Sequence, residues 1–250
     1  VASGLSGRRL SVGMRVLRGR DPRPVADREH TAALLAGASD GTPGLRVWTP
    51  PRQVAFGRRD AREPGFDCAK RIAAERGFEP IERDVGGRAV AYPGDTLAFA
   101  HAVPLGDDRN LGSVGERYDR ATETVLGALR SLGADVSRGE SPDSFCPGDH
   151  SVRVAGGGKV AGVAQRVRGD AALVAGCVVV TRADARAVAE VTAAVYDALG
   201  VPFDPESVGS VAEAGGPGEP KTVARALEKA FVDGAWGEGD PQVASVDRDS

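Results

Sequence analysis

Residues 151–180 read SVRVAGGGKVAGVAQRVRGDAALVAGCVVV, and this stretch gives the clearest evidence of the fold. The segment SVRV is followed by the glycine-rich turn AGGG and then by KVAGVAQRV, which together predict a β-hairpin. The next segment, ALVAGCVVV, is an apolar run with several β-branched residues, as is typical of a buried strand. We therefore expect three neighbouring strands that run antiparallel.

Helices and hairpins alternate on either side of this stretch. Residues 114–132 form the clearest predicted helix, because apolar side chains recur there at spacings of three and four and Gly133 follows as a stop. Further helices are expected at 27–37, 66–76, 188–199 and 220–232, and further strands at 45–48, 53–56, 78–83, 88–91 and 96–103. Since no regular βαβ repeat is present, the pattern predicts an α+β fold, in which mixed or antiparallel sheets carry helices packed against them.

The composition is that of an ordinary globular protein, with 41% hydrophobic and 27% charged residues over 250 positions. One domain is expected at 1–233, and the acidic, glycine-rich segment 234–250 is predicted to be a disordered tail. No apolar run is long enough for a membrane helix and no signal-peptide core is visible, which predicts a cytoplasmic protein without a membrane partner. The net charge of −3 argues against a nucleic-acid partner, since such proteins usually carry a basic excess.

Three cysteines are present, without a CxxC pair or a His/Cys cluster, so neither a disulfide framework nor a metal site is expected. Cys146 lies in the loop sequence DSFCPGDH, where a nearby cation can stabilise a nucleophilic thiolate. Cys177 lies among hydrophobic residues, as structural cysteines usually do, and Cys68 is interpreted as a packing residue on a helix. His150, four residues after Cys146, is a candidate base for its thiol.

Lys159 stands out because only four of the 32 basic residues are lysines, which leaves 28 arginines. The sequence GGGK is not a phosphate-binding loop, since Val160 occupies the position that requires Ser or Thr. A compact ammonium fits a single carbonyl oxygen better than a broad guanidinium does. Strand alternation would place Lys159 and Gln165 on one face, with small residues between them that leave room for a substrate. A surface lysine at the end of a hairpin is the alternative.

The segment RDVGGRAVAYPGDTLAF at 83–99 contains a glycine pair between two predicted strands. Gly86 and Gly87, flanked by Arg83 and Arg88, would let the main chain approach a ligand closely and offer N–H donors. The strand–helix context of a dinucleotide-binding motif is missing. On the residues alone, a tight glycine turn between the strands 78–83 and 88–91 is slightly favoured.

Taken in order, these segments resemble the lipoate–protein ligase and octanoyltransferase family of the lipoate/biotin-ligase superfamily, over about residues 45–210. The family's strand with a Gly-Arg turn resembles the segment VWTPPRQVAFGRRD. Its arginine–glycine signature resembles RDVGGRAVAYPGDTLAFAHAVP, and its lysine-containing hairpin resembles KVAGVAQRVRGDAALVAGCVVV. SFCPGDHSVRV before KVAGVAQR resembles the cysteine-dependent transferases, because ATP-dependent ligases have no nucleophilic cysteine there. Tyr92 stands where the ligase signature has His.

The resemblance implies a biotin-ligase-like (class II aminoacyl-tRNA-synthetase-like) α+β catalytic domain that moves an octanoyl or lipoyl group to a lysine. The group would pass through a thioester on Cys146, with the charge of Lys159 beside the acyl oxygen. The acceptor would be a lipoyl domain of a 2-oxoacid dehydrogenase or a glycine-cleavage H-like protein, and an acyl carrier protein is a further candidate donor. No metal or other cofactor is required by this route. The implied substrate-binding residues are Arg83, Val85, Gly86, Gly87, Arg88, Ala89, Gly162, Val163, Ala164 and Gln165.

Two other functions remain open at this point. An ATP-dependent lipoate–protein ligase would use free acid, ATP and magnesium and would not need Cys146. A non-catalytic subunit of a split ligase would bind an acyl group or a lipoyl domain without turnover.

Overall fold

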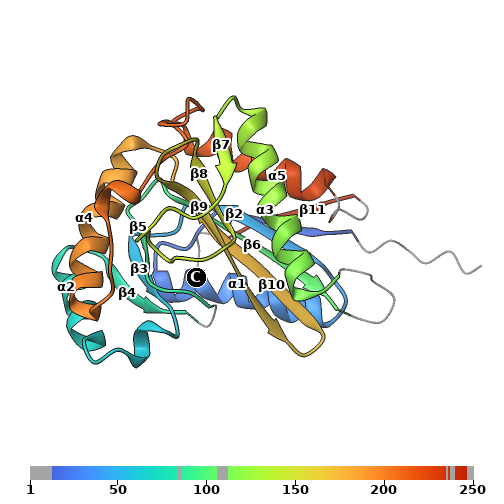
Figure 1. Ribbon diagram of the computed structural model, residues 1–250. Helices are drawn as coiled ribbons and strands as arrows, with labels where there is room; N and C mark the ends of the chain where they lie inside the picture. The colour runs from blue at the N-terminus through green and yellow to red at the C-terminus, as the bar shows by residue number, and fades with distance from the viewer. Residues whose placement is uncertain (1–12, 84–85, 106–111, 235, 237–239, 247–250) are drawn as a thin grey trace, which may run out of the picture.

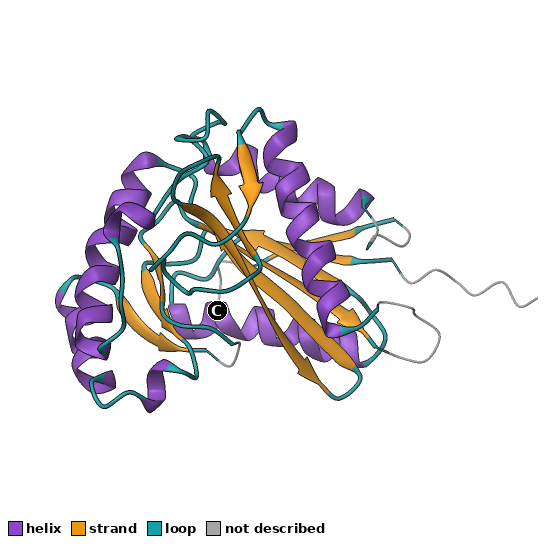
Figure 2. Cartoon of the chain, in the orientation of Figure 1, coloured by secondary structure: helices purple, strands orange, loops and turns teal. Residues whose placement is uncertain are grey.

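A computed structural model describes residues 13–83, 86–105, 112–234, 236 and 240–246. Most of the strands form one eight-stranded sheet in the order β11-β1-β2-β6-β10-β9-β8-β7 (Figures 1 and 2). Its strands are β1 (Arg15–Arg18), β2 (Gly44–Trp48), β6 (Leu97–Pro104), β7 (Val136–Arg138), β8 (Ser151–Val154), β9 (Lys159–Arg168), β10 (Ala171–Val178) and β11 (Gln242–Ser245). β8, β9 and β10 are consecutive antiparallel neighbours, which confirms the arrangement predicted for residues 151–180.

A second, three-stranded sheet contains β3 (Gln53–Phe56), β4 (Glu79–Glu82) and β5 (Val90–Tyr92). β3 lies in the middle, parallel to β4 and antiparallel to β5. The glycine pair Gly86-Gly87 therefore does not turn between paired strands, and the predicted hairpin is wrong. The segment that contains these glycines connects the two edge strands past the end of β3, because β4 and β5 pair with β3 and not with each other.

In the described part of the chain, five α-helices cover the sheets: α1 (Pro24–Ser39), α2 (Phe66–Glu75), α3 (Val114–Ser131), α4 (Arg182–Leu199) and α5 (Pro220–Asp233). α1 packs on one face of the large sheet, and α3 and α5 pack on the other (Figure 1). α2 and α4 cover the small sheet. Each predicted helix is present, and α3 begins with a capping box between Ser113 and Glu116, in which each side chain accepts from the other's main-chain N–H. The α+β prediction is confirmed.

A buried ion pair fixes α1 to the large sheet. Nη2 of Arg46, on β2, lies 2.5 Å from Oδ1 of Asp27, and Nε1 of Trp48 donates to the second carboxylate oxygen at 2.9 Å. Arg46 and Asp27 are both buried, so each charge depends on the other for compensation. No helix within the described ranges is long and apolar enough to cross a bilayer.

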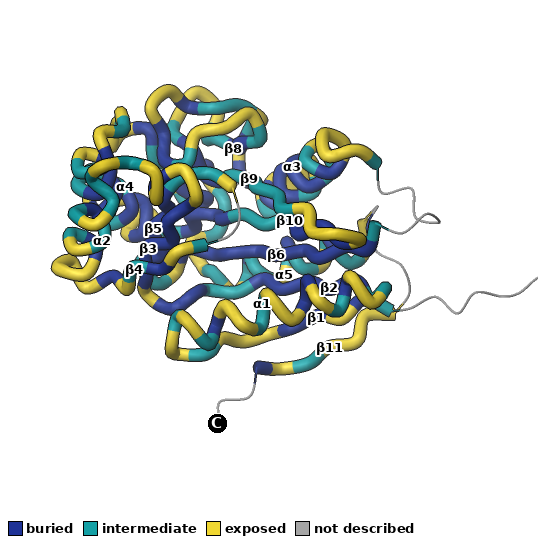
Figure 3. Tube along the Cα trace, turned by 90° about the horizontal axis from the view of Figure 1, so that it is seen from below, coloured by how far each residue is buried: buried dark blue, intermediate teal, exposed yellow. Residues whose placement is uncertain are grey.

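The predicted disordered tail is partly an ordered strand. Gln242–Ser245 form β11, which runs parallel to β1, and Figure 3 shows the two segments side by side. Val246, directly after β11, is buried against Leu17 and α1. The composition of this segment is polar, but its main chain satisfies the hydrogen bonds of an otherwise unpaired sheet edge. The disorder prediction is therefore wrong for residues 242–246.

Candidate active site

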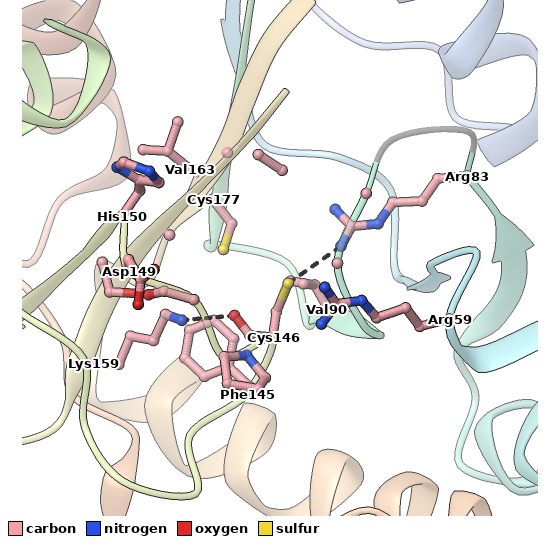
Figure 4. Close-up of a pocket in the computed structure, with 18 of the residues that line it drawn as sticks. Arg59, Arg83, Val90, Phe145, Cys146, Asp149, His150, Lys159, Val163 and Cys177 are labelled. Carbon is pink, nitrogen blue, oxygen red and sulfur yellow. Dashed lines mark hydrogen bonds between the residues drawn. The ribbon is translucent and has the colours of Figure 1, made fainter. Parts of the chain in front are cut away.

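A pocket of about 380 Å³ opens between the two sheets, and it contains both Cys146 and Lys159 (Figure 4). The glycine segment after β4 forms one wall through Gly86 and Gly87. β9 and β10 form another wall, where Gly162 and Cys177 are cross-strand neighbours. Residues far apart in the sequence therefore meet here because the small sheet packs against one end of the large one.

Cys146 lies in the loop between β7 and β8 and adopts a left-handed main-chain conformation, with φ of 43°. Asp143, three residues earlier, also has a positive φ, 47°. For residues other than glycine this conformation costs about 1–2 kcal/mol each, so other contacts must hold the loop in place. One such contact comes from α4, where the hydroxyl of Tyr196 accepts from the Cys146 N–H at 2.7 Å and donates to the Ala89 carbonyl at 3.0 Å.

Two donors from the arginine–glycine segment face the sulfur of Cys146. Nη2 of Arg83 lies 3.5 Å from Sγ, and the main-chain N–H of Arg88 donates to Sγ at 3.3 Å. Nη2 of Arg83 also donates to the Arg88 carbonyl at 2.7 Å, which links the two donors to each other. A cation and an N–H at these positions stabilise a thiolate more than a thiol.

Gly87 makes this approach sterically feasible. Its φ is 98°, and a Cβ atom at this position would lie 2.5 Å from the sulfur of Cys146. No side chain could occupy that space without moving the sulfur, so the second glycine of the pair is required by the contact itself. In the structure the glycine pair thus permits the close approach of a residue of the chain, Cys146, whereas the predicted approach to a ligand stays a prediction.

Lys159 is almost completely buried, with 1% of its side chain exposed, and it contacts the main chain of the cysteine loop. Its ammonium donates to the carbonyl oxygen of Cys146 at 2.8 Å and lies 3.3 and 3.4 Å from the two carboxylate oxygens of Glu140. Figure 4 shows the Cys146 carbonyl facing Lys159, while its sulfur faces Arg83. The surface-lysine alternative is therefore wrong.

A β-bulge corrects the predicted face of β9. Arg153 pairs with Lys159 but the neighbouring Val152 pairs with Ala161, so Val160 is an extra residue that breaks the alternation. A Cβ at Gly162 would lie 3.1 Å from Cε of Lys159, which places these two residues on the same face. Gln165 lies on the other face, toward α3, where it accepts from Nε of Arg117 and donates to the Val114 carbonyl. Of the predicted residues on β9, the pocket lining includes Gly162, Val163 and Ala164.

Two other residues predicted to bind the substrate, Arg88 and Ala89, differ in their positions relative to the pocket. The side chain of Arg88 pairs with Asp60 and Glu63, so only its main-chain N–H faces the sulfur. Ala89 is buried behind the pocket, where its carbonyl accepts from Tyr196. Val85 lies outside the described residues.

His150 lines the same pocket but does not act on Cys146 in this arrangement. Its ring stacks on Tyr118 at 4.1 Å between centroids, and Nδ1 lies 3.3 Å from Nη2 of Arg138. Partial burial and the charge of Arg138 lower the pKa of His150 below its usual value. Among the described residues no hydrogen bond joins His150 to Cys146, so the geometry does not support the predicted base.

Cys177 differs from Cys146 in its surroundings, although both line the pocket. Burial raises the pKa of the Cys177 thiol to about 11, and the side chain is 3% exposed. This thiol therefore stays protonated at neutral pH, as expected for a structural cysteine.

Glu140 is a residue that the sequence interpretation missed. Its carboxylate accepts from the hydroxyls of Ser144 and Ser151, from the Gly148 N–H at 3.1 Å, and from the Lys159 ammonium. Its position before a proline- and glycine-rich loop carries no recognisable motif. Arg59 and Arg62 were also missed, and both line the pocket from the connection after β3.

A second cavity of about 230 Å³ adjoins the first, since Arg83 and Gly176 line both. It lies between α1 and the large sheet, and most of its walls are small or apolar. Its lining includes Trp48, Tyr92, Ala98, Ala100, Leu173 and Ala175. Within the described part of the chain, no group of three or more His, Cys, Asp or Glu side chains is arranged to hold a metal ion.

Comparison with known proteins identifies one family and one fold. The family model described as "Lipoyl protein ligase A/B catalytic domain" matches residues 23–232. An octanoyl-[GcvH]:protein N-octanoyltransferase of Geobacillus kaustophilus is 32% identical over 142 residues, which is 56% of this chain and 48% of the relative. A protein of the same name from Oceanobacillus iheyensis is 28% identical over 138 residues, 55% of this chain and 48% of that relative. The chain thus spans about half the length of the curated relatives it matches.

Among solved structures, a lipoate-protein ligase A bound with ATP superposes with a TM-score of 0.73 at 22% identity, covering 94% of this chain and 90% of that one. A bi-partite archaeal lipoate protein ligase from Thermoplasma acidophilum gives a TM-score of 0.68 at 20% identity and covers 94% and 88% of the two chains. At these identities, the likeness establishes the fold.

Proposed function

The chain belongs to the lipoyl protein ligase A/B catalytic domain family, and we propose that it is an acyltransferase that moves an octanoyl or lipoyl group through a thioester on Cys146. The observation that carries this proposal is the position of the sulfur. It lies at the pocket wall between the Arg83 guanidinium and the Arg88 N–H. A nucleophilic cysteine needs this combination of access and nearby positive charge.

The reaction takes place in two steps. The Cys146 thiolate attacks the carbonyl carbon of an acyl thioester or amide, the bond to the donor breaks, and the donor's leaving group takes up a proton. The neutral amine of an acceptor lysine then attacks the thioester, Cys146 leaves as a thiolate, and an amide forms with loss of one proton. Dividing the transfer into two steps replaces one difficult reaction by two easier ones.

Arg83 and the Arg88 N–H stabilise the thiolate in this proposal, and Lys159 holds the peptide unit of Cys146 in place. The predicted placement of the Lys159 charge beside the acyl oxygen stays a prediction. It requires the ammonium to exchange one of its present acceptors, Glu140 or the Cys146 carbonyl, for the oxyanion of the tetrahedral intermediate.

The acyl chain occupies the second cavity, between α1 and the sheet. This cavity meets the first at Arg83 and Gly176, so a carbonyl carbon at Cys146 can continue into an apolar chain there. Burying about six methylenes of an octanoyl group contributes about 5 kcal/mol, at ~0.8 kcal/mol each. In this proposal the side chains that enclose the acyl chain come from β2, β6 and β10, such as Trp48, Ala98 and Ala175.

The partner in this proposal is a lipoyl domain, which supplies the acceptor lysine. The curated relatives carry the name octanoyl-[GcvH]:protein N-octanoyltransferase, which supports an octanoylated H-like protein as the donor. No nucleotide or metal takes part in this route, whereas the ligase alternative requires ATP and magnesium.

Mass spectrometry after incubation with an octanoylated H-like protein tests the proposal. We expect one octanoyl group on Cys146 and transfer to an acceptor lipoyl domain without ATP. The Cys146→Ala and Cys146→Ser variants should lose both, while Cys68→Ala retains them as a matched control. Full transfer by Cys146→Ala, or transfer from free octanoate that requires ATP and magnesium, would overturn the proposal in favour of a ligase. Acyl binding without turnover under any donor would favour a non-catalytic subunit.

A further inference from the structure

Glu140 joins four parts of the active-site loop and its neighbouring strands. Its carboxylate accepts from Ser144, two residues before Cys146, and from Gly148, two residues after it. It also accepts from Ser151, at the start of β8, and from Lys159, at the start of β9. The donors therefore bracket Cys146 on both sides, and one side chain connects the loop to the sheet.

The loop needs such a connection because two of its non-glycine residues, Asp143 and Cys146, have a positive φ. Free in solution, a segment of this composition would populate other conformations. Glu140 contacts the chain on both sides of Cys146, so its hydrogen bonds restrain the peptide unit that directs the sulfur toward Arg83. Tyr196 adds one further restraint from α4, through the Cys146 N–H.

Glu140 also provides the negative charge that the buried ammonium of Lys159 requires. With 1% of its side chain exposed, Lys159 has little access to water, and a buried ammonium is unfavourable unless it is paired. The carboxylate of Glu140, 3.3 Å away, offsets this charge. The sulfur is also in contact with a second cation, Arg83, for which the described residues show hydrogen bonds to the Arg88 carbonyl and to the sulfur.

We propose that Glu140 is a positioning residue for the acyl transfer, which holds the Cys146 loop in its left-handed conformation and offsets the charge of Lys159. The expected effect of Glu140 on the transfer rate rests on the proposed function. Its expected effect on the reactivity of the Cys146 thiol does not, because that effect needs no acyl transfer. With Glu140 in place, the charge of Lys159 is paired. Without it, the ammonium behind Cys146 has no carboxylate partner among the described residues.

The test compares Glu140→Gln with Glu140→Asp, and Glu190→Gln on the exposed face of α4 is the matched control. Two quantities are measured for each protein: the rate of Cys146 alkylation by iodoacetamide against pH, and single-turnover transfer from an octanoylated H-like protein. For Glu140→Gln we expect half-maximal alkylation at a lower pH than in the wild type, because the charge of Lys159 is no longer offset. Transfer should fall at least tenfold in rate with little change in KM for the donor.

Glu140→Asp keeps the negative charge but shortens the side chain, so it separates the two effects. Its alkylation profile should match the wild type while its transfer rate falls. Glu190→Gln should leave both quantities unchanged. Thermal melting shows whether each variant is folded, and a fall in melting temperature by itself would not move the pH profile.

Wild-type behaviour of Glu140→Gln in both measurements would overturn the inference. The inference would also be overturned if the loss of transfer only matched the fraction of unfolded protein and the pH profile of alkylation were unchanged. That result would indicate a purely structural role for Glu140. If Glu140→Gln does not fold, Glu140→Asp and Ser151→Ala, which removes one donor to the carboxylate, take its place. If the wild type shows no transfer, the proposed function fails, yet the alkylation profile still tests the role of Glu140.

Discussion

The ammonium of Lys159 and the main-chain oxygen of Cys146 lie 2.8 Å apart, so the lysine holds the peptide unit of the cysteine and the sulfur faces away from it. The sulfur instead meets the guanidinium of Arg83. Two cations thus contact Cys146 at different atoms, Lys159 at the main-chain oxygen and Arg83 at the sulfur. Their roles can therefore be separated by experiment.

Replacing Lys159 with Met should lower the transfer rate by about ten- to a hundredfold. The reason is the loss of a hydrogen bond from a charged donor, worth about 1.5–3 kcal/mol, that holds the Cys146 carbonyl. Lys159→Arg should not restore activity, because the buried space between Glu140 and the Cys146 carbonyl is shaped for an ammonium. Single-turnover kinetics measures the effect, and wild-type rates in both variants would contradict it.

Arg83→Gln should reduce the rate at which Cys146 reacts with iodoacetamide at neutral pH by about tenfold or more, because a charged hydrogen bond to the thiolate is lost. Peptide mass mapping of Cys68 in the same sample is the internal control, since that thiol lies on α2 beside Arg71. An equal slowing at Cys68 and Cys146 would indicate a global effect and count against the assignment.

Ala175→Leu should shorten the acyl chain that the protein accepts. Ala175 lines the second cavity and is paired with Ala100 across the strands, so the added carbons would project into the space assigned to the chain. We expect KM to rise for octanoyl donors and to change less for butanoyl donors, with each excluded methylene worth ~0.8 kcal/mol. A uniform change across chain lengths would show that the chain binds elsewhere.

His101 should make the protein less stable in acid. Burial lowers the pKa of His101 to about 3, and neither ring nitrogen has a partner among the described residues. Between pH 6.5 and 3 the unfolded chain therefore binds a proton that the folded protein does not. The free energy of unfolding should fall with decreasing pH in this window, by up to about 1.4 kcal/mol per pH unit.

The His101→Leu variant tests this contribution. Urea unfolding at pH 7, 5 and 4 should show a weaker loss of stability toward acid for His101→Leu than for the wild type. The other titrating groups are common to both proteins and cancel in the comparison. Identical pH dependence of the two proteins would show that His101 is not the group responsible.

The local elements of the fold could be predicted from the sequence, but their long-range pairing could not. Each helix and the hairpin from β8 to β10 follow from periodicity and turn residues close in the chain. The insertion of β3 between β4 and β5 depends on contacts between distant segments, which no local pattern records. β11 was missed for the same reason, since its polar composition resembles a disordered tail and its pairing with β1 is visible only after folding.

Two residues of the candidate site could be predicted because their residue type is unusual for its place in the sequence. Cys146 in a loop and Lys159 in an arginine-rich chain were selected on that basis, and the structure places both in one pocket. Their roles in catalysis stay predictions. The extra residue Val160 shifted Lys159 to the other face from Gln165, and a one-residue bulge leaves no trace in a sequence of small apolar residues. Glu140 could not be found, because its importance comes entirely from partners that folding brings to it.

The parallel pair of β1 and β11 also bears on the order in which the molecule assembles. Arg15 pairs with Gln242, so one border of the large sheet is closed by segments from early and late in the chain. β1 is synthesised before β11, so it has no outer neighbour in the sheet until the residues after α5 have left the ribosome. Such distant pairings form slowly, because the entropy cost of closing a long loop comes before any stabilising contact forms. The closing of this border therefore comes late among the strand pairings of the large sheet, on the side of the sheet away from the pocket.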